Sequence, residues 1–137
     1  MRTKVLLIAV AALLVVPASV WAHHAFAAEF DATKPINLKG KVVKMEWINP
    51  HAWIHIEVPS ADGKLVKWMI EAAAPNAMLR RGFDQQSLPI GTEIVVAGYR
   101  AKDGANRANG SSITYPDGKK LFIGSQGTGA PEEQQPR

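Results

Sequence analysis

The 137-residue sequence contains no cysteine. This absence excludes a disulfide framework, thiol redox chemistry, thiolate zinc sites and lipid attachment to an N-terminal cysteine. No apolar run reaches the roughly 20 residues that span a bilayer as a helix. The length limits the chain to one small domain, because doubly wound nucleotide-binding domains and barrel enzymes need more residues.

The first residues have the layout of an export signal. Arg2 and Lys4 form a basic start, and residues 5–16 are an apolar run of about a dozen residues. Pro17 ends this run, and the segment Val20-Trp21-Ala22 has small residues at the two positions that a signal peptidase reads. The pattern predicts a secretory signal peptide.

We expect cleavage after Ala22, which removes residues 1–22 and leaves a periplasmic chain without a membrane anchor. The whole chain has a net charge of +4, but the 115-residue mature chain keeps 14 basic and 12 acidic side chains, since two basic residues leave with the signal. Its remaining charge of +2 does not favour a nucleic-acid partner.

Alternating apolar residues predict a domain of β-strands over residues 36–124, after an arm at 23–35 and before a disordered tail at 125–137. Within the first strand the apolar phase slips by one residue at Val43, which predicts a β-bulge. A short helix is predicted at residues 75–82, from its opening proline to its closing glycine. The predicted strands are Ile36–Asn49, Ala52–Val58, Leu65–Ala72, Glu93–Arg100 and Ser111–Tyr115, followed by a small hairpin at Lys119–Ile123.

Two local patterns predict details of this domain. In the second strand one face is expected in the core and consists of Ala52, Ile54, Ile56 and Val58. The other face consists of His51, Trp53, His55 and Glu57. The dipeptide Asn109-Gly110 is interpreted as a turn.

Three strands, a short helix and two further strands follow one another in the order of an OB-fold. We therefore predict an all-β domain with one short helix, arranged as an OB-like five-stranded Greek-key barrel. A β-sandwich is the alternative, and it is disfavoured because it needs seven or more strands from a similar length.

Several separated motifs resemble a known family. They are His23-His24-Ala25-Phe26, Glu46-Trp47-Ile48-Asn49-Pro50-His51, Ala74-Pro75-Asn76-Ala77, Leu79-Arg80-Arg81-Gly82, Gly98-Tyr99-Arg100-Ala101-Lys102-Asp103-Gly104 and Pro116-Asp117-Gly118-Lys119-Lys120-Leu121-Phe122. In this order they resemble a proteobacterial exported family, domain of unknown function family 6152. The resemblance runs from about His23 to Ser125. It implies a periplasmic location and a small β-barrel, and it supplies no catalytic residues.

The four histidines, His23, His24, His51 and His55, fall at two places in the sequence. Cleavage after Ala22 would make His23 the amino terminus. Its amine and imidazole could chelate one metal ion, and a second imidazole would complete a histidine brace, a nitrogen set that suits copper. The simpler interpretation is that these histidines are ordinary polar surface residues.

Strand geometry allows only one of the two later histidines in this brace. His51 and His55 are four residues apart, roughly 13 Å along a regular strand at about 3.3 Å per residue. His51 is slightly favoured because it follows Asn49-Pro50, where the first strand ends and the backbone direction is less constrained. His55, beside Trp53, is the alternative.

Tryptophans suggest a second function. Trp53 and Trp68 could form an aromatic barrel face that binds a small molecule or a protein without metal. Burial of large aromatic residues in the core is the competing interpretation. Because no phosphate-binding loop, nucleophile elbow or metalloprotease motif occurs, we expect a binding protein and not an enzyme.

Overall fold

A computed structural model describes residues 26–126 and 128–131 of the chain. The predicted signal peptide, His23, His24 and the end of the predicted tail lie outside these residues. Residues 26–29 are helical. The elements that follow are β1 (Phe30–Glu46), β2 (Trp53–Pro59), β3 (Leu65–Glu71), α3 (Pro75–Arg80), β4 (Glu93–Ala101), β5 (Arg107–Thr114) and β6 (Lys120–Phe122).

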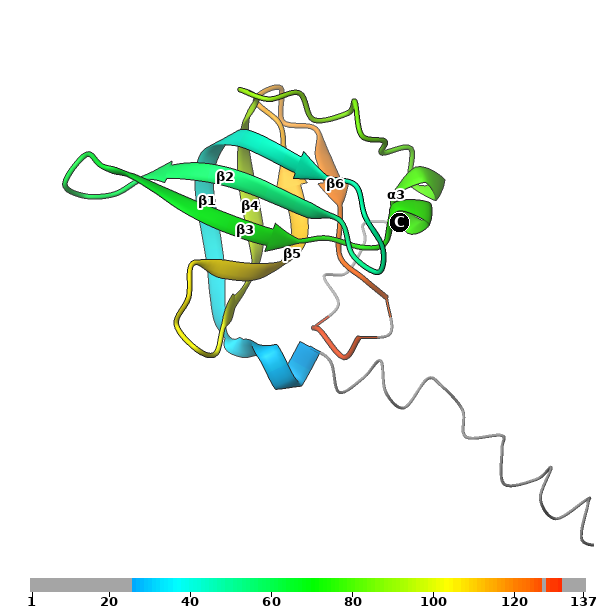
Figure 1. The fold of residues 1–137 in the computed structure, drawn as a ribbon, viewed down its shortest axis with the longest axis horizontal. Helices are drawn as coiled ribbons and strands as arrows, with labels where there is room; N and C mark the ends of the chain where they lie inside the picture. Colours follow the sequence, from blue (N-terminus) through cyan, green and yellow to red (C-terminus); the bar gives the residue numbers. More distant parts are fainter. Residues whose placement is uncertain (1–25, 127, 132–137) are drawn as a thin grey trace, which may run out of the picture.

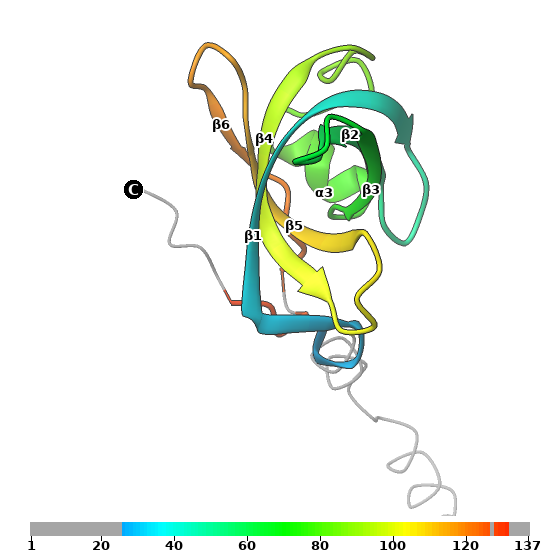
Figure 2. The same cartoon turned by 90° about the vertical axis from the view of Figure 1, so that its left-hand side faces the viewer.

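Six strands form one mostly antiparallel sheet in the order β3-β2-β1-β4-β5-β6 (Figure 1). A parallel pairing of β3 with β5 joins the two sides of this sheet, so that β1 to β5 close into a ring (Figure 2). β6 is added to β5 outside that ring. The predicted all-β class is confirmed, and the Greek-key OB-like arrangement stays a prediction.

The long strand β1 pairs with a different neighbour on each of its two edges. Its first part pairs with β4 and its last part with β2, and the register shifts between Val42 and Lys44. This shift confirms the β-bulge predicted at Val43. β1 begins at Phe30 rather than at Ile36, because Phe30 pairs with Ala101 of β4, a contact between residues far apart in the sequence.

The interpretation of Asn109-Gly110 as a turn is wrong, because both residues lie inside β5. Asn109 pairs with Tyr99 of β4 and with Glu71 of β3, where the ring closes. Packing requires the glycine, since a Cβ on Gly110 would lie 2.7 Å from side-chain atoms of Ile70 and Ile123. The dipeptide therefore permits close approach of strands, and it does not reverse the chain.

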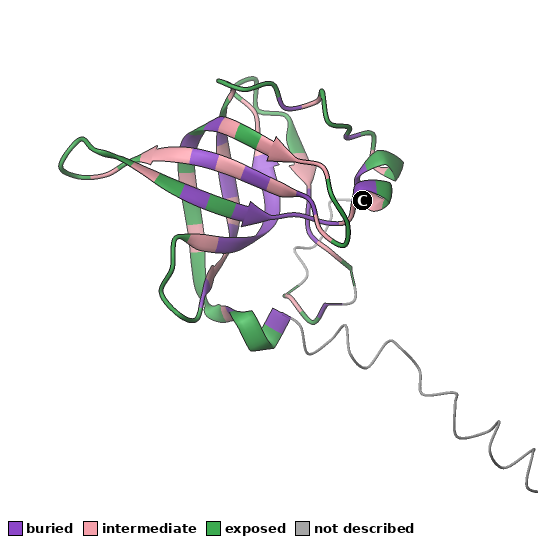
Figure 3. Cartoon of the chain, viewed as in Figure 1, coloured by how far each residue is buried: buried purple, intermediate pink, exposed green. Residues whose placement is uncertain are grey.

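The core fills the inside of the ring (Figure 3). Ala52, Ile54 and Ile56 are fully buried, as their alternation predicts, while Trp53 and His55 are only partly exposed on the other face of β2. Val58, also expected in the core, is only partly buried because it lies near the end of β2. The helix α3 lies at one end of the ring and buries Met78 in the same core.

Part of the predicted disordered tail packs on the domain. Thr128 is buried, and Ala130 contacts a small cluster formed by Phe26, Phe30 and Ala101. This cluster also fixes the helical residues 26–29 near the end of β4, in a region where the sequence indicated only an extended arm or a turn.

Candidate functional site

A recess of about 440 Å³ opens where the ring closes, between the ends of β1, β3 and β5. Its lining combines aromatic and charged side chains with the loop that carries His51. We call it the His51 recess, and the lining residues used below are Phe26, Glu29, His51, Trp53, Glu71, Arg107 and Thr128.

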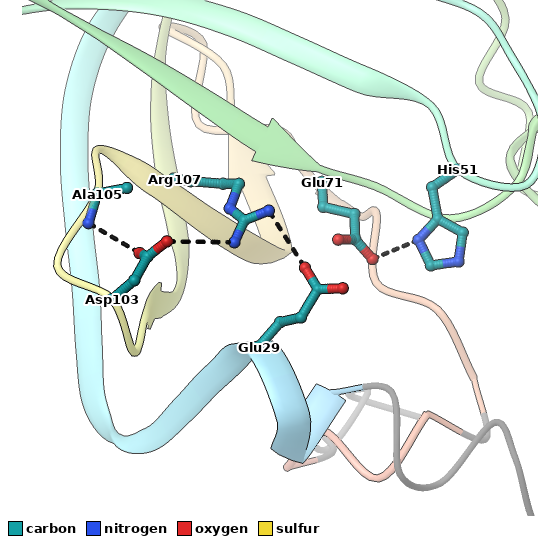
Figure 4. Close-up of polar contacts among 6 residues, drawn as sticks. All are labelled: Glu29, His51, Glu71, Asp103, Ala105 and Arg107. Carbon is teal, nitrogen blue, oxygen red and sulfur yellow. Dashed lines mark hydrogen bonds and ion pairs between the residues drawn. The ribbon is translucent and has the colours of Figure 1, made fainter.

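His51 stands in the loop between β1 and β2, directly after the cis peptide bond Asn49-Pro50. Its Nδ1 atom is hydrogen-bonded to Oε1 of Glu71, the last residue of β3 (Figure 4). Glu71 is only 8% exposed. The pair thus places a carboxylate against one ring nitrogen and leaves the other ring nitrogen facing away from Glu71.

Electrostatics favour the protonated ring of His51. The hydrogen bond to Glu71 raises the pKa of His51 most strongly, and partial burial opposes this effect. The negative charges of Glu71 and Glu29 raise the pKa further. Glu29 and His51 border the same recess.

A second set of ion pairs lies beside this histidine. Arg107 Nη1 is 3.2 Å from Oε2 of Glu29, and Arg107 Nη2 is 3.7 Å from Oδ2 of Asp103 (Figure 4). The guanidinium of Arg107 also lies 5.6 Å from the centre of the Phe30 ring. Arg107 thereby links the helical residues 26–29 to β5.

Phe26 is the first described residue and borders the same recess as His51. It is 4% exposed, with ring centres 5.8 Å from Phe30 and 5.6 Å from Tyr99. The backbone nitrogen of Lys102 donates to the carbonyl of Glu29 at 2.9 Å. These contacts hold the chain at the edge of the recess only three residues after His23.

His55 occupies a different environment. Its Nε2 atom lies 2.7 Å from Oε2 of Glu46, across the β1–β2 pairing. His55 does not line the His51 recess. The structure thus separates the two histidines that the sequence left as alternatives.

The two tryptophans expected on a common aromatic face are also separated. Trp53 is partly exposed and lines the recess beside His51. Trp68 is 8% exposed and belongs to the core, where the guanidinium of Arg100 lies 5.2 Å from its ring centre. Only Trp53 presents an accessible ring to the recess.

Sequence reasoning missed Glu29, Glu71 and Arg107 as members of this site. A signal for Glu71 exists, because it interrupts the otherwise apolar stretch from Met69 to Ala74, and a carboxylate in such a stretch needs a partner. Glu29 and Arg107 carry no comparable signal, since they meet only through the folded chain.

Within residues 26–126 and 128–131, no group of three or more His, Asp or Glu side chains is placed to hold a metal ion. His23 and His24 are outside this range. The same part of the chain contains no helix that is long and apolar enough to cross a membrane.

Comparison with known proteins gives one match. A family model described as "Family of unknown function (DUF6152)" matches residues 10–111. The match includes Phe26, Glu29, His51, Glu71 and Arg107. Neither a curated protein nor a solved structure matches the chain.

Proposed function

The chain belongs to a family of unknown function, DUF6152, which supplies no activity, and we propose from the geometry that the exported protein binds a copper ion between its amino terminus and His51. The proposal includes cleavage after Ala22, a periplasmic location and a role in binding without catalysis. The amine and imidazole of His23 and the imidazole of His51 are the proposed ligands.

One observation carries this proposal: Phe26 and His51 border the same recess. His23 is three positions before Phe26, and extended chain covers about 3.3–3.6 Å per residue, so the new amino terminus would reach roughly 10 Å beyond Phe26. This reach, together with the shared recess, is the basis for pairing the His23 nitrogens with His51.

The pairing of His51 supports the same role. In the neutral ring, Nδ1 donates its hydrogen to Glu71 and Nε2 has a free lone pair. Because the pKa of His51 is raised, a metal ion must displace the proton from Nε2 when it binds. Histidine ligands commonly donate their other ring nitrogen to a carboxylate, which fixes the tautomer and makes the ligand more basic. Glu71 fits this supporting position, and its burial keeps it there.

His55 is less suited to the site, so the proposal favours His51. The Nε2 atom of His55 is already bonded to Glu46, and the side chain does not border the recess near Phe26. His24 follows His23 directly and is proposed as a further contact of the ion. Three nitrogen ligands without thiolate agree with the preference of copper(II) for nitrogen donors.

Copper titration of the processed protein tests the proposal. Electron spin resonance should report a nitrogen-ligated copper(II) centre with one ion per chain. An additional alanine before His23 should abolish this centre, and His51→Ala should weaken it by about tenfold or more, as loss of one ligand predicts. His55→Ala is the matched control, because it removes an imidazole outside the recess.

A second candidate is the binding of a small ligand by the same recess without metal. The observation that favours it is the volume of about 440 Å³ with Trp53 at its wall, within the range of small-molecule sites. Such binding would persist when a residue is added before His23. Copper binding that is equally tight with this added residue would reject the brace and favour the second candidate.

A further inference from the structure

A second recess, of about 400 Å³, adjoins the first and contains two arginines. It shares Pro50, His51 and Thr128 with the His51 recess. Its other lining residues include Arg80 and Arg81 at the end of α3, together with Ser125 and Gln126. We call it the arginine recess.

The charge of the arginine recess is unbalanced. No Asp or Glu belongs to its lining. In the part of the chain that the structure describes, neither Arg80 nor Arg81 forms an ion pair with a carboxylate. Arg107, by contrast, has both Glu29 and Asp103 as partners. Two arginines thus line a cavity that has no carboxylate in its lining.

Arg81 is held in place by contacts that do not neutralise it. Its Nη1 donates to the carbonyl oxygen of Gly124 at 2.8 Å, and the guanidinium lies 4.8 Å from the centre of the Phe122 ring. Burial and the neighbouring charge of Arg80 lower the pKa of Arg81. The guanidinium is therefore fixed in position in surroundings that disfavour its positive charge. A bound anion would lower the free energy of the charged form.

We propose that the arginine recess binds the oxyanion group of a small molecule, a carboxylate or a phosphate. Arginine presents a planar fork of N–H donors that matches both groups, and charge-assisted hydrogen bonds of this kind are strong. The hydroxyl group of Ser125 belongs to the same lining and is a further donor, whereas that of Thr128 already donates to the carbonyl oxygen of Ser125 at 3.4 Å. The volume accommodates a small organic anion. This inference goes beyond the copper site and does not rest on it.

Calorimetric titration of the metal-free exported protein tests the proposal, with citrate and inorganic phosphate as separate probes. We expect saturable binding of at least one probe. Arg80→Gln should weaken it by about tenfold or more, since a hydrogen bond to a charged group contributes that much. Lys67→Gln is the matched control, because it removes one positive charge from an exposed position on β3 outside the recess.

Amide chemical shifts locate the bound anion. The shifts of Arg81, Ser125 and Thr128 should change with the same dissociation constant that calorimetry gives. Arg80 is exposed, and within the described part of the chain the hydrogen bond to Gly124 and the contact with the Phe122 ring are made by Arg81, so Arg80→Gln keeps the test valid even if Arg81→Gln fails to fold.

Two results would overturn the proposal. The first is the absence of saturable binding of both probes at millimolar concentration. The second is an equal loss in the Arg80→Gln and Lys67→Gln variants, which would indicate an unspecific charge effect.

Discussion

His51, in the loop after β1, is bonded through Nδ1 to Oε1 of Glu71 at the end of β3. The two residues are 20 positions apart in the sequence. The contact exists because Glu71 pairs with Trp53 on one side and with Asn109 on the other, so the closed ring fixes the carboxylate beside the loop. The histidine is thereby oriented with its second ring nitrogen directed away from the carboxylate.

The first prediction concerns the titration of this histidine. Its pKa should lie above the ordinary value of about 6.5, and Glu71→Gln should lower it, because the variant keeps only a neutral acceptor and loses the negative charge while burial remains. Nuclear magnetic resonance of the imidazole protons measures both values. Glu46→Gln is the control, since it removes the partner of His55 and should leave His51 unchanged.

The raised pKa of His51 also has a consequence for stability. A group with a raised pKa in the folded state stabilises the protein fully below its unfolded pKa, and this contribution is lost as the pH rises through the folded pKa. The stability deficit of Glu71→Gln should therefore be larger at about pH 5.5 than at about pH 8.5. Urea denaturation at both pH values measures it, and an equal deficit would contradict the assignment.

A second prediction tests the register of β2. Ile56 is fully buried, so Ile56→Ala should lower the free energy of unfolding by about 2–5 kcal/mol through lost burial and the cavity left behind. Leu65→Ala is the control, because Leu65 is 61% exposed and its truncation should change stability by about 0.5 kcal/mol or less. Similar effects of the two substitutions would show that the register is wrong.

The third prediction concerns the closing of the ring. A Cβ on Gly98 would lie 2.1 Å from the backbone oxygen of Asn109, at the register shift between β4 and β5. Because backbone must move to accommodate it, Gly98→Ala should destabilise the fold more than Gly63→Ala does. Gly63 has a positive φ but open space around it, and its substitution should cost about 1 kcal/mol. Thermal unfolding compares the two variants.

Phe26 provides the fourth prediction. Its ring anchors the chain at the edge of the recess, so Phe26→Ala should reduce copper affinity by about tenfold through loss of preorganisation, even though the side chain offers no ligand atom. Leu79→Ala removes a large apolar side chain that is 51% exposed on α3, and it should leave the affinity unchanged. An unaffected Phe26→Ala variant would contradict anchoring of the amino terminus at this position.

Local patterns predicted much of the fold. Alternation in β2 identified its buried face, the slip at Val43 located the bulge, and the proline and glycine around α3 marked its ends. Long-range pairing decided the rest. The early start of β1 depends on Ala101, and the strand conformation of Asn109-Gly110 depends on β3 and β4, so neither is visible in a local window.

The candidate site was predictable only in part. His51 was singled out because the chain has few histidines and because His51 directly follows Asn49-Pro50, where the predicted first strand ends. Its partner Glu71 lies on a strand that reaches His51 only after the ring closes. The distinction between His51 and His55 likewise required knowledge of which of the two borders Phe26. Alternation alone could not decide whether Trp68 is buried in the core or exposed on the surface, since large aromatic residues occur in both environments.

The most direct test of the central claim is a crystal structure of the exported protein with copper bound, with the metal located by anomalous scattering. We expect one copper ion bonded to Nε2 of His51 and to the amine and imidazole of His23, with Glu71 still bonded to Nδ1 of His51. A copper ion bonded to His55, or a His23 amine remote from His51, would contradict the proposed site.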